Sequence, residues 1–195
     1  MLTLNKSWHF QFMEIGTHNS MSYLEPKRWY MYPFRFIAKC QSMPINEQYK
    51  KGIRLFDIRI SYNKNNYPEF RHGSMAFKGD VFEILTWLNN QGDPIKIRLI
   101  LEEKSESKLR ESLFIGDVSK FKVLFPNLTF YEGRRKFDWK QIADLPTLDI
   151  TQLVGSMSGK LIYKIYPKLY AKKYNDKNIN TYLDIKPLLI DFFNG

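Results

Sequence analysis

The chain has few of the residues that form disulfides or hold structural metal ions. Its 195 residues include one cysteine, Cys40, so no disulfide can form within the chain. No zinc-finger spacing, Walker-type loop or RNA-binding aromatic signature is present. A nucleic-acid-binding function would therefore depend on charge alone, and we expect no nucleic-acid partner. We expect Cys40 to be a small buried side chain rather than a catalytic thiol.

Long apolar runs are also absent. No stretch approaches the roughly 20 apolar residues that span a bilayer. The N-terminus lacks an apolar stretch followed by a cleavage site. We expect a soluble chain that is peripheral to membranes, and the sequence leaves open whether it is cytoplasmic or secreted.

The composition has an excess of positive charge together with enough apolar residues for a core. The formal net charge is +10 and 44% of the residues are hydrophobic. We expect residues 1–195 to form one monomeric domain. The charge favours an anionic partner such as a phospholipid surface.

Two stretches in the first third of the chain place charged or titratable residues next to strands. The strand-like run Phe10–Ile15 ends at Gly16, and His18 follows in the turn. In the run Ile53–Ile60, Asp57 and Arg59 alternate with apolar residues, so they share one face of a strand. In a barrel covered outside by helices, that charged face would point inward.

The remaining pattern alternates strands and helices, which is typical of a parallel α/β fold. In the first two thirds we expect helices over 45–51, 81–90 and 105–125, the last broken near Gly116, a turn over 63–66, and strands over 67–72, 96–102 and 127–131. Further on we expect a short helix over 148–154, a strand over 160–166, an exposed excursion over 170–180 and a strand over 188–193.

Seven candidate site residues fall at or near the C-terminal ends of these predicted strands. They are His18, Asp57, Arg59, His72, Glu102, Lys164 and Asp191. The C-terminal ends of the strands are where a (β/α) barrel builds its active site. Because a full eight-unit barrel takes about 250 residues, we predict a compact α/β fold, a TIM-type (β/α) barrel that is irregular or incomplete.

Several motifs, taken in order, resemble the X-domain of phosphatidylinositol-specific phospholipases C. They are the Gly16–Ser20 turn, the run Gln41–Gln48, the stretch Gly52–Arg59, His72 with Gly73, the run Gly159–Lys164 and the run Leu189–Phe192. The resemblance covers most of the chain. It implies a phosphodiesterase that cleaves phosphatidylinositol to diacylglycerol and a cyclic inositol phosphate.

The resemblance also implies a role for each candidate residue. His18 would be the general base with Asp191 as its partner, and His72 the general acid. Arg59, oriented by Asp57, matches the secreted bacterial type, in which an arginine replaces a calcium ion. The same resemblance implies that Lys164 contacts the headgroup, and Glu102 offers an acceptor for sugar hydroxyls. No cofactor is then expected.

Asn19 departs from the bacterial pattern, which has an aspartate there to support the general acid. Asparagine is instead typical of the calcium-dependent enzymes. A second interpretation is therefore a calcium- or magnesium-dependent glycerophosphodiester-type enzyme with Asn19, Asp57 and Glu102 as ligands. A third is a non-catalytic protein that binds anionic lipids. We favour the first, with Asn19 contacting substrate, because Arg59 would repel a divalent ion at short range.

The segment 27–36 mixes aromatic residues with lysine and arginine. This combination is found where proteins contact a membrane interface, and it is also compatible with aromatic side chains packed on the outer wall of a barrel. The basic loop around Arg134 and Arg135 we expect to be solvated rather than bound to substrate.

Overall fold

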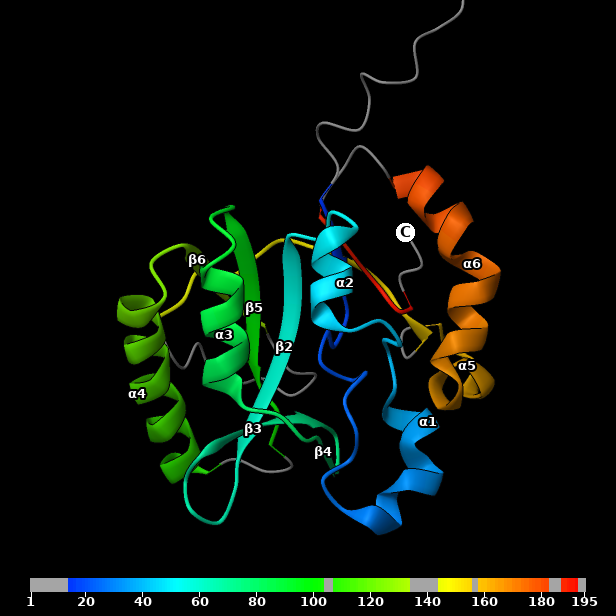
Figure 1. The fold of residues 1–195 in the computed structure, drawn as a ribbon. Helices are drawn as coiled ribbons and strands as arrows, with labels where there is room; N and C mark the ends of the chain where they lie inside the picture. Colours follow the sequence, from blue (N-terminus) through cyan, green and yellow to red (C-terminus); the bar gives the residue numbers. More distant parts are fainter. Residues whose placement is uncertain (1–13, 104–106, 134–143, 156–157, 183–186, 193–195) are drawn as a thin grey trace, which may run out of the picture.

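The computed structural model describes residues 14–103, 107–133, 144–155, 158–182 and 187–192 of the chain. Within these residues a single sheet of eight strands curls into a half-barrel (Figure 1). Its strands are β1 (Ile15–Thr17), β2 (Leu55–Tyr62), β3 (Pro68–His72), β4 (Met75–Ala76), β5 (Ile95–Leu101), β6 (Leu128–Glu132), β7 (Thr151–Leu153) and β8 (Leu188–Ile190).

Six of these strands are parallel and form the wall of the half-barrel in the order β6-β5-β2-β1-β8-β7. The strands β3 and β4 form an antiparallel hairpin on the C-terminal end of β2. A parallel bridge between Glu132 and Thr147 links the β6 edge to the segment that leads into β7. The C-terminal ends of the parallel strands therefore meet around one mouth, as in a barrel.

The helices are η1 (Trp29–Phe34, a 3₁₀-helix), α1 (Arg35–Ala38), α2 (Ile45–Lys50), α3 (Val81–Asn89), α4 (Lys108–Leu124), α5 (Leu161–Ile165) and α6 (Pro167–Tyr182). Figure 1 shows α3 and α4 on one side of the sheet and α5 and α6 at its other end. None of the helices in the described part of the chain is long and apolar enough to cross a membrane.

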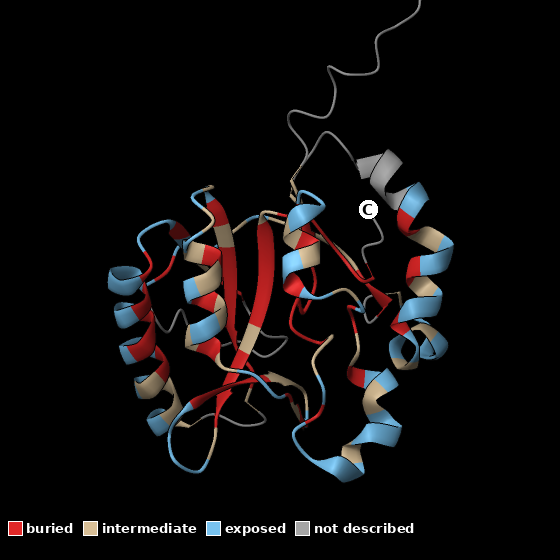
Figure 2. Ribbon diagram, viewed as in Figure 1, coloured by how far each residue is buried: buried red, intermediate tan, exposed pale blue. Residues whose placement is uncertain are grey.

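The core lies between β2, β5 and the two helices α3 and α4. Buried side chains of this core include Phe56, Ile58, Ile97, Leu85 and Phe121. Figure 2 shows the resulting pattern, with buried strands and helices that are buried only on the face toward the sheet. A buried face on one side of each helix is the arrangement that an amphipathic helix on a sheet requires.

Alternation along β2 divides its side chains between two faces, as predicted. Phe56 and Ile58 belong to the core beneath the helices, whereas Asp57 and Arg59 point into the half-barrel and contact other site residues. The interior is narrow, because a Cβ on Gly16 would lie 2.6 Å from side-chain atoms of Leu55 and Leu189. Glycine at this position lets β1 pass between its two neighbouring strands.

Most predicted elements in residues 45–133 are confirmed within a few residues. The prediction of a break near Gly116 is wrong, because α4 is continuous from Lys108 to Leu124. Gly116 is exposed, while Phe114 and Val118 on either side of it are buried. Their burial offsets the cost of about 1 kcal/mol for a glycine inside a helix. The first predicted strand, Phe10–Ile15, lies mostly outside the described residues, and β1 begins at Ile15.

The predictions for the segments 148–154 and 160–166 are both wrong. Residues 151–153 form β7, which pairs with the open edge of β8. With that edge occupied, the segment 160–166 lies outside the sheet, and residues 161–165 form helix α5 after the turn at Gly159, whose φ is +74°. The strand preference of the apolar residues in 160–166 is thus overridden by tertiary structure.

The predicted exposed excursion over 170–180 is also wrong, because helix α6 covers it. Ala171 and Asn175, four residues apart, are buried on one face of this helix. Tyr170 and Tyr174 form a cluster with Tyr163, in which the ring centroids of Tyr170 and Tyr174 are 5.0 Å apart. These contacts stabilise a helix whose sequence is rich in lysine and asparagine.

Candidate active site

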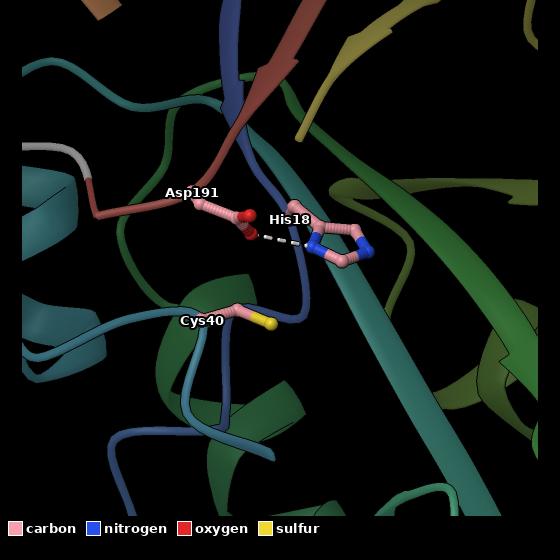
Figure 3. Close-up of side chains that lie close together, drawn as sticks. All are labelled: His18, Cys40 and Asp191. Atoms are coloured by element: carbon pink, nitrogen blue, oxygen red, sulfur yellow. Dashed lines mark hydrogen bonds and ion pairs between the residues drawn. The ribbon is translucent and has the colours of Figure 1, made fainter. Parts of the chain in front are cut away.

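A buried histidine and a buried aspartate form a hydrogen-bonded dyad at the end of two neighbouring strands. His18 follows β1, and Asp191 follows β8, which pairs with β1 in parallel. The imidazole Nδ1 of His18 lies 2.7 Å from Oδ1 of Asp191 (Figure 3), and the side chains are 4% and 1% exposed. The other carboxylate oxygen, Oδ2, accepts a hydrogen bond from the backbone N–H of Gly155. Each carboxylate oxygen of Asp191 therefore has a partner, one the imidazole of His18 and the other the backbone of Gly155.

Arg59 is the centre of the charged network in the half-barrel. Its Nε donates to Asp57 at 3.2 Å, its Nη1 lies 3.4 Å from Glu102, and its Nη2 lies 2.6 Å from Nε2 of His18. A guanidinium has no acceptor, so Nε2 of His18 must accept this hydrogen bond. The ring proton of the neutral imidazole then lies on Nδ1 and is donated to Asp191. This tautomer presents the lone pair of Nε2 to the mouth of the site.

Asp57 anchors this network from below. It is fully buried, and its two carboxylate oxygens accept hydrogen bonds from Arg98, from Arg59 and from the backbone N–H of Asn19. Burial alone would raise the pKa of Asp57, but the charges of Arg98 and Arg59 lower it well below its ordinary value. Asp57 is thus a carboxylate that contacts Arg59, and the two share the inward face of β2, as the alternation predicted.

The second histidine is held in another way. His72 ends β3, and its Nδ1 lies 2.9 Å from the backbone carbonyl oxygen of Ala38, to which it donates. Burial, followed by the charge of Arg59, lowers the pKa of His72 to about 4. The rings of His18 and His72 lie 6.2 Å apart, at right angles. Both imidazoles therefore border the same space above Arg59.

Glu102 connects the hairpin to the wall of the half-barrel. One of its carboxylate oxygens accepts a hydrogen bond from the backbone N–H of Gly73 at 3.0 Å, and the other contacts Arg59. The side chain is buried. Its predicted place on the inward face of the strand is confirmed, and its contacts position the turn that carries His72.

Asn19 contributes its backbone to the site. It has a positive φ of 44°, which asparagine tolerates better than most residues. Its backbone N–H donates to Asp57 at 3.0 Å. The side chain is 1% exposed, and its Nδ2 has no hydrogen-bond partner among the described residues. The predicted contact between this side chain and a substrate stays a prediction.

Three polar residues that the sequence did not mark as site residues support the site through buried hydrogen bonds. Gln41 donates from Nε2 to the backbone carbonyls of His18 and Ile190. Ser22 accepts at Oγ from the backbone N–H groups of Cys40 and Gln41. The third, Arg98 of β5, donates to Asp57 at 2.6 Å. A charged residue on the inner face of a strand is the signal that could have found it.

Lys164 was predicted to lie at the end of a strand, and this placement is wrong. The predicted contact of Lys164 with a headgroup stays a prediction. The residue is exposed on helix α5 and does not belong to the sheet. Arg134 and Arg135 lie outside the described residues. The site as the structure brings it together consists of His18, Asp57, Arg59, His72, Glu102 and Asp191, joined by Arg98.

The segment 27–36 lies beside His72. Its helix η1 leads directly into α1, which ends at Ala38, the hydrogen-bond partner of His72. Trp29 is 82% exposed and Phe34 is 53% exposed. A cavity of about 340 Å³ lies between this segment and the hairpin, lined by Met31, Phe34, Ile37, Ala38, His72, Gly73, Ser74 and Met75. Apart from His72 and Ser74, its lining side chains are apolar.

The set Asn19, Asp57 and Glu102 does not fit a divalent metal ion in this arrangement. Asp57 and Glu102 both contact the guanidinium of Arg59, and Asp57 also binds Arg98. A cation placed between these carboxylates would meet two fixed positive charges at short range. The metal-dependent interpretation would require Arg59 to leave the position it holds.

Comparisons of the sequence and of the structure with known proteins give different results. No model of a known protein family matches the sequence, and no curated protein sequence matches it. The fold, in contrast, is similar to the phosphatidylinositol-specific phospholipase C from Listeria monocytogenes, with a TM-score of 0.64 and 16% identity over 92% of this chain and 87% of the Listeria chain. A variant of the phospholipase of the same name from Staphylococcus aureus matches with a TM-score of 0.67 and 12% identity, over 93% of this chain and 85% of that one. The chain therefore has the half-barrel fold of these phospholipases.

Proposed function

We propose that this chain is a phosphodiesterase that cleaves phosphatidylinositol, or a related inositol phospholipid, to diacylglycerol and a cyclic inositol phosphate. The observation that carries the proposal is the placement of a carboxylate-bound histidine, an arginine and a second histidine around one mouth of the half-barrel. The similarity of its fold to two bacterial phospholipases supports it. We further propose that residues 1–195 act as one monomeric catalytic domain.

In the first step His18 acts as the general base. Its Nε2 accepts the proton of the inositol 2-hydroxyl while that oxygen attacks phosphorus. Asp191 accepts the hydrogen bond of Nδ1, which holds the ring in this tautomer and stabilises the imidazolium that forms. In the structure Arg59 occupies the position in front of Nε2 at 2.6 Å, so the substrate hydroxyl displaces this contact as it binds.

Arg59 then binds the phosphoryl group. A guanidinium released from Nε2 presents its N–H groups to the phosphate oxygens, and it can bind two of them at once. Asp57 and Glu102 hold the other nitrogens and keep the charge in place. The pKa of Arg59 is raised, because Asp57 and Glu102 outweigh the effect of burial, which would lower it. The arginine thus neutralises the developing charge without a metal ion.

His72 acts as the general acid. It transfers a proton from Nε2 to the departing diacylglycerol oxygen, and Nδ1 stays bound to the carbonyl of Ala38. Since its pKa is lowered to about 4, His72 is neutral before substrate binds at neutral pH. The negative phosphate of the substrate favours the protonated form. Protonation of His72 is therefore coupled to substrate binding.

The apolar cavity of about 340 Å³ beside His72 suits the glycerol end of a lipid. It starts at the general acid, where the leaving oxygen departs, and extends along Phe34 and Ile37 of the exposed segment. We place the aromatic and basic residues 27–36 at the membrane interface on this basis, where their rings and cations suit the headgroup region.

The experiment is hydrolysis of phosphatidylinositol vesicles in excess chelator, with His18→Ala as the control. Release of a cyclic inositol phosphate by the wild type, and its loss in the variant, is the expected result. Activity that appears only when calcium is added would favour the metal-dependent alternative instead. If the wild type binds the vesicles without any hydrolysis in either condition, the chain is a lipid-binding protein and the proposal is wrong.

A further inference from the structure

The mechanism gives no role to the one thiol of the chain, although this thiol lies beside the catalytic dyad. Cys40 Sγ, a ring nitrogen of His18 and a carboxylate oxygen of Asp191 all lie within 4.8 Å of one another. Figure 3 shows the three side chains converging from three separate segments. All three residues are at least 96% buried. A thiol, an imidazole and a carboxylate are the ligand types that Zn²⁺ prefers in proteins.

We propose that Cys40, His18 and Asp191 form an inhibitory site for a borderline-soft divalent metal ion, of which Zn²⁺ is the type. Zinc bonds of about 2.0 Å to nitrogen or oxygen and 2.3 Å to sulfur place tetrahedral ligands about 3.5 Å apart. The pair His18 Nδ1 and Asp191 Oδ1 is closer than this, at 2.7 Å, and Sγ lies within 4.8 Å of a ring nitrogen of His18 and of a carboxylate oxygen of Asp191. Changes of about 1 Å in these separations would give the spacing of ligands on one zinc ion.

A fourth ligand is available next to the thiol. Nδ1 of His72 lies 3.8 Å from Sγ of Cys40, close to the spacing of two ligands on one zinc ion. To bind the ion, His72 gives up its hydrogen bond to the carbonyl of Ala38. Both catalytic histidines then belong to the metal site.

The charges allow such an ion. The thiol releases its proton to solvent and becomes a thiolate, and the proton on Nδ1 of His18 moves to Nε2, so the imidazole stays neutral. The thiolate and the Asp191 carboxylate together balance the ion. Burial and the nearby Asp191 raise the pKa of the Cys40 thiol, so without metal the thiol keeps its proton. Because binding releases this proton, affinity should rise with pH.

The same proton movement explains inhibition. With a metal ion on Nδ1, the proton sits on Nε2, and the base has no lone pair to accept the proton of a hydroxyl. An N–H at Nε2 would also face the Nη2 of Arg59, which is only 2.6 Å away and can only donate. Metal binding therefore removes the base and displaces the arginine.

Binding is tested without reference to activity by titrating the chain with Co²⁺. Because Cys40 is the only cysteine, a thiolate-to-metal charge-transfer band in the near ultraviolet reports this residue alone. We expect such a band in the wild type, its removal by one equivalent of Zn²⁺, and its absence in Cys40→Ser. Absence of the band in the wild type would overturn the proposal.

Inhibition, which rests on the proposed function, is tested in the vesicle assay. Zn²⁺ should inhibit the wild type reversibly, with activity restored by chelator. Cys40→Ser should keep its activity without metal, and its inhibitory Zn²⁺ concentration should be at least about tenfold higher. Equal inhibition of both proteins would contradict the proposal. If the chain proves inactive on this lipid, the Co²⁺ band still decides the metal site.

Discussion

The two histidines of the site differ in what holds them. His18 is 4% exposed, lies at the end of a parallel strand and is bound to a carboxylate. His72 ends a strand of the antiparallel hairpin and is bound to the carbonyl of Ala38. His18 donates its Nδ1 hydrogen bond to a carboxylate, whereas burial and the charge of Arg59 lower the pKa of His72.

This difference suits opposite roles in one reaction. A base must be neutral before substrate binds and must become stable as a cation, which the partner Asp191 provides. An acid must carry a proton that it gives away readily, and a low pKa makes His72 a strong acid once the phosphate has favoured its protonation. In the proposed mechanism the base, His18, is therefore organised in advance, and the acid, His72, depends on the substrate for its proton.

The largest effect should come from the arginine that both histidines face. Arg59→Ala removes the cation that we propose binds the phosphate, and kcat should fall by about 10³-fold to 10⁵-fold. Arg59→Lys should recover only part of this loss, because it cannot bind two oxygens in a fixed plane. Thermal melting checks that the variant is folded. We expect it to fold, because Asp57 keeps Arg98 as a charged partner when Arg59 is removed. A loss below tenfold in steady-state kinetics would contradict the role of Arg59.

The base side is tested next by removing the charge of the partner of His18. Asp191→Asn keeps the size of the side chain but favours the wrong tautomer of His18, so kcat should fall by about 10³-fold to 10⁴-fold. The matched control is Asp117→Asn, a buried acid on helix α4 that contacts Tyr62 and Lys120. The control should leave kcat nearly unchanged. Equal losses in the two variants would show that the effect is structural.

The lowered pKa of His72 predicts that the stability of the fold depends on pH. The folded-state pKa of His72 is about 4, below the ordinary value of 6.5. Its contribution to stability is therefore fully present above about pH 6.5 and is lost as the pH falls toward 4, by at most about 3 kcal/mol. His72→Gln should be less sensitive to acid over this interval in urea unfolding. A variant with the same pH profile as the wild type would mean that His72 is not buried in this way.

The smallest effect should come from Ser22, whose side chain holds the backbone of Cys40 and Gln41 beside the site. Ser22→Ala leaves the buried backbone N–H groups of Cys40 and Gln41 without their acceptor, which should lower the free energy of unfolding by about 1–3 kcal/mol. Ser119→Ala, on the exposed face of α4, is the control and should change stability by less than about 0.5 kcal/mol. If both variants melt at the same temperature, the strand ends do not depend on Ser22.

The sequence predicted the base side better than the acid side. His18, Asp57 and Arg59 lie on or directly after strands, and the alternation of side chains along a strand sets the direction in which they point. The partner of His72, by contrast, is a backbone carbonyl in a short helix. No residue type marks a carbonyl as an acceptor, so the contact with Ala38 could not be predicted.

The C-terminal third was predicted least well. The apolar and aromatic residues around Lys164 are compatible with a strand, but β7 occupies the edge of β8 and this segment forms a helix. Asp191 was nevertheless placed correctly, because a carboxylate among apolar residues is costly to bury without a partner. Local pattern therefore failed where the order of strands in the sheet decided the structure.

The division of roles between the histidines is tested most directly by changing the leaving group. His18→Ala and His72→Ala are assayed on phosphatidylinositol and on an inositol nitrophenyl phosphate, whose leaving group needs no proton. His72→Ala should lose about 10²-fold to 10⁴-fold on the lipid but remain close to wild type on the nitrophenyl ester, whereas His18→Ala should fail on both. Equal losses of His72→Ala on both substrates would contradict its role as the acid and, with it, the account of the site.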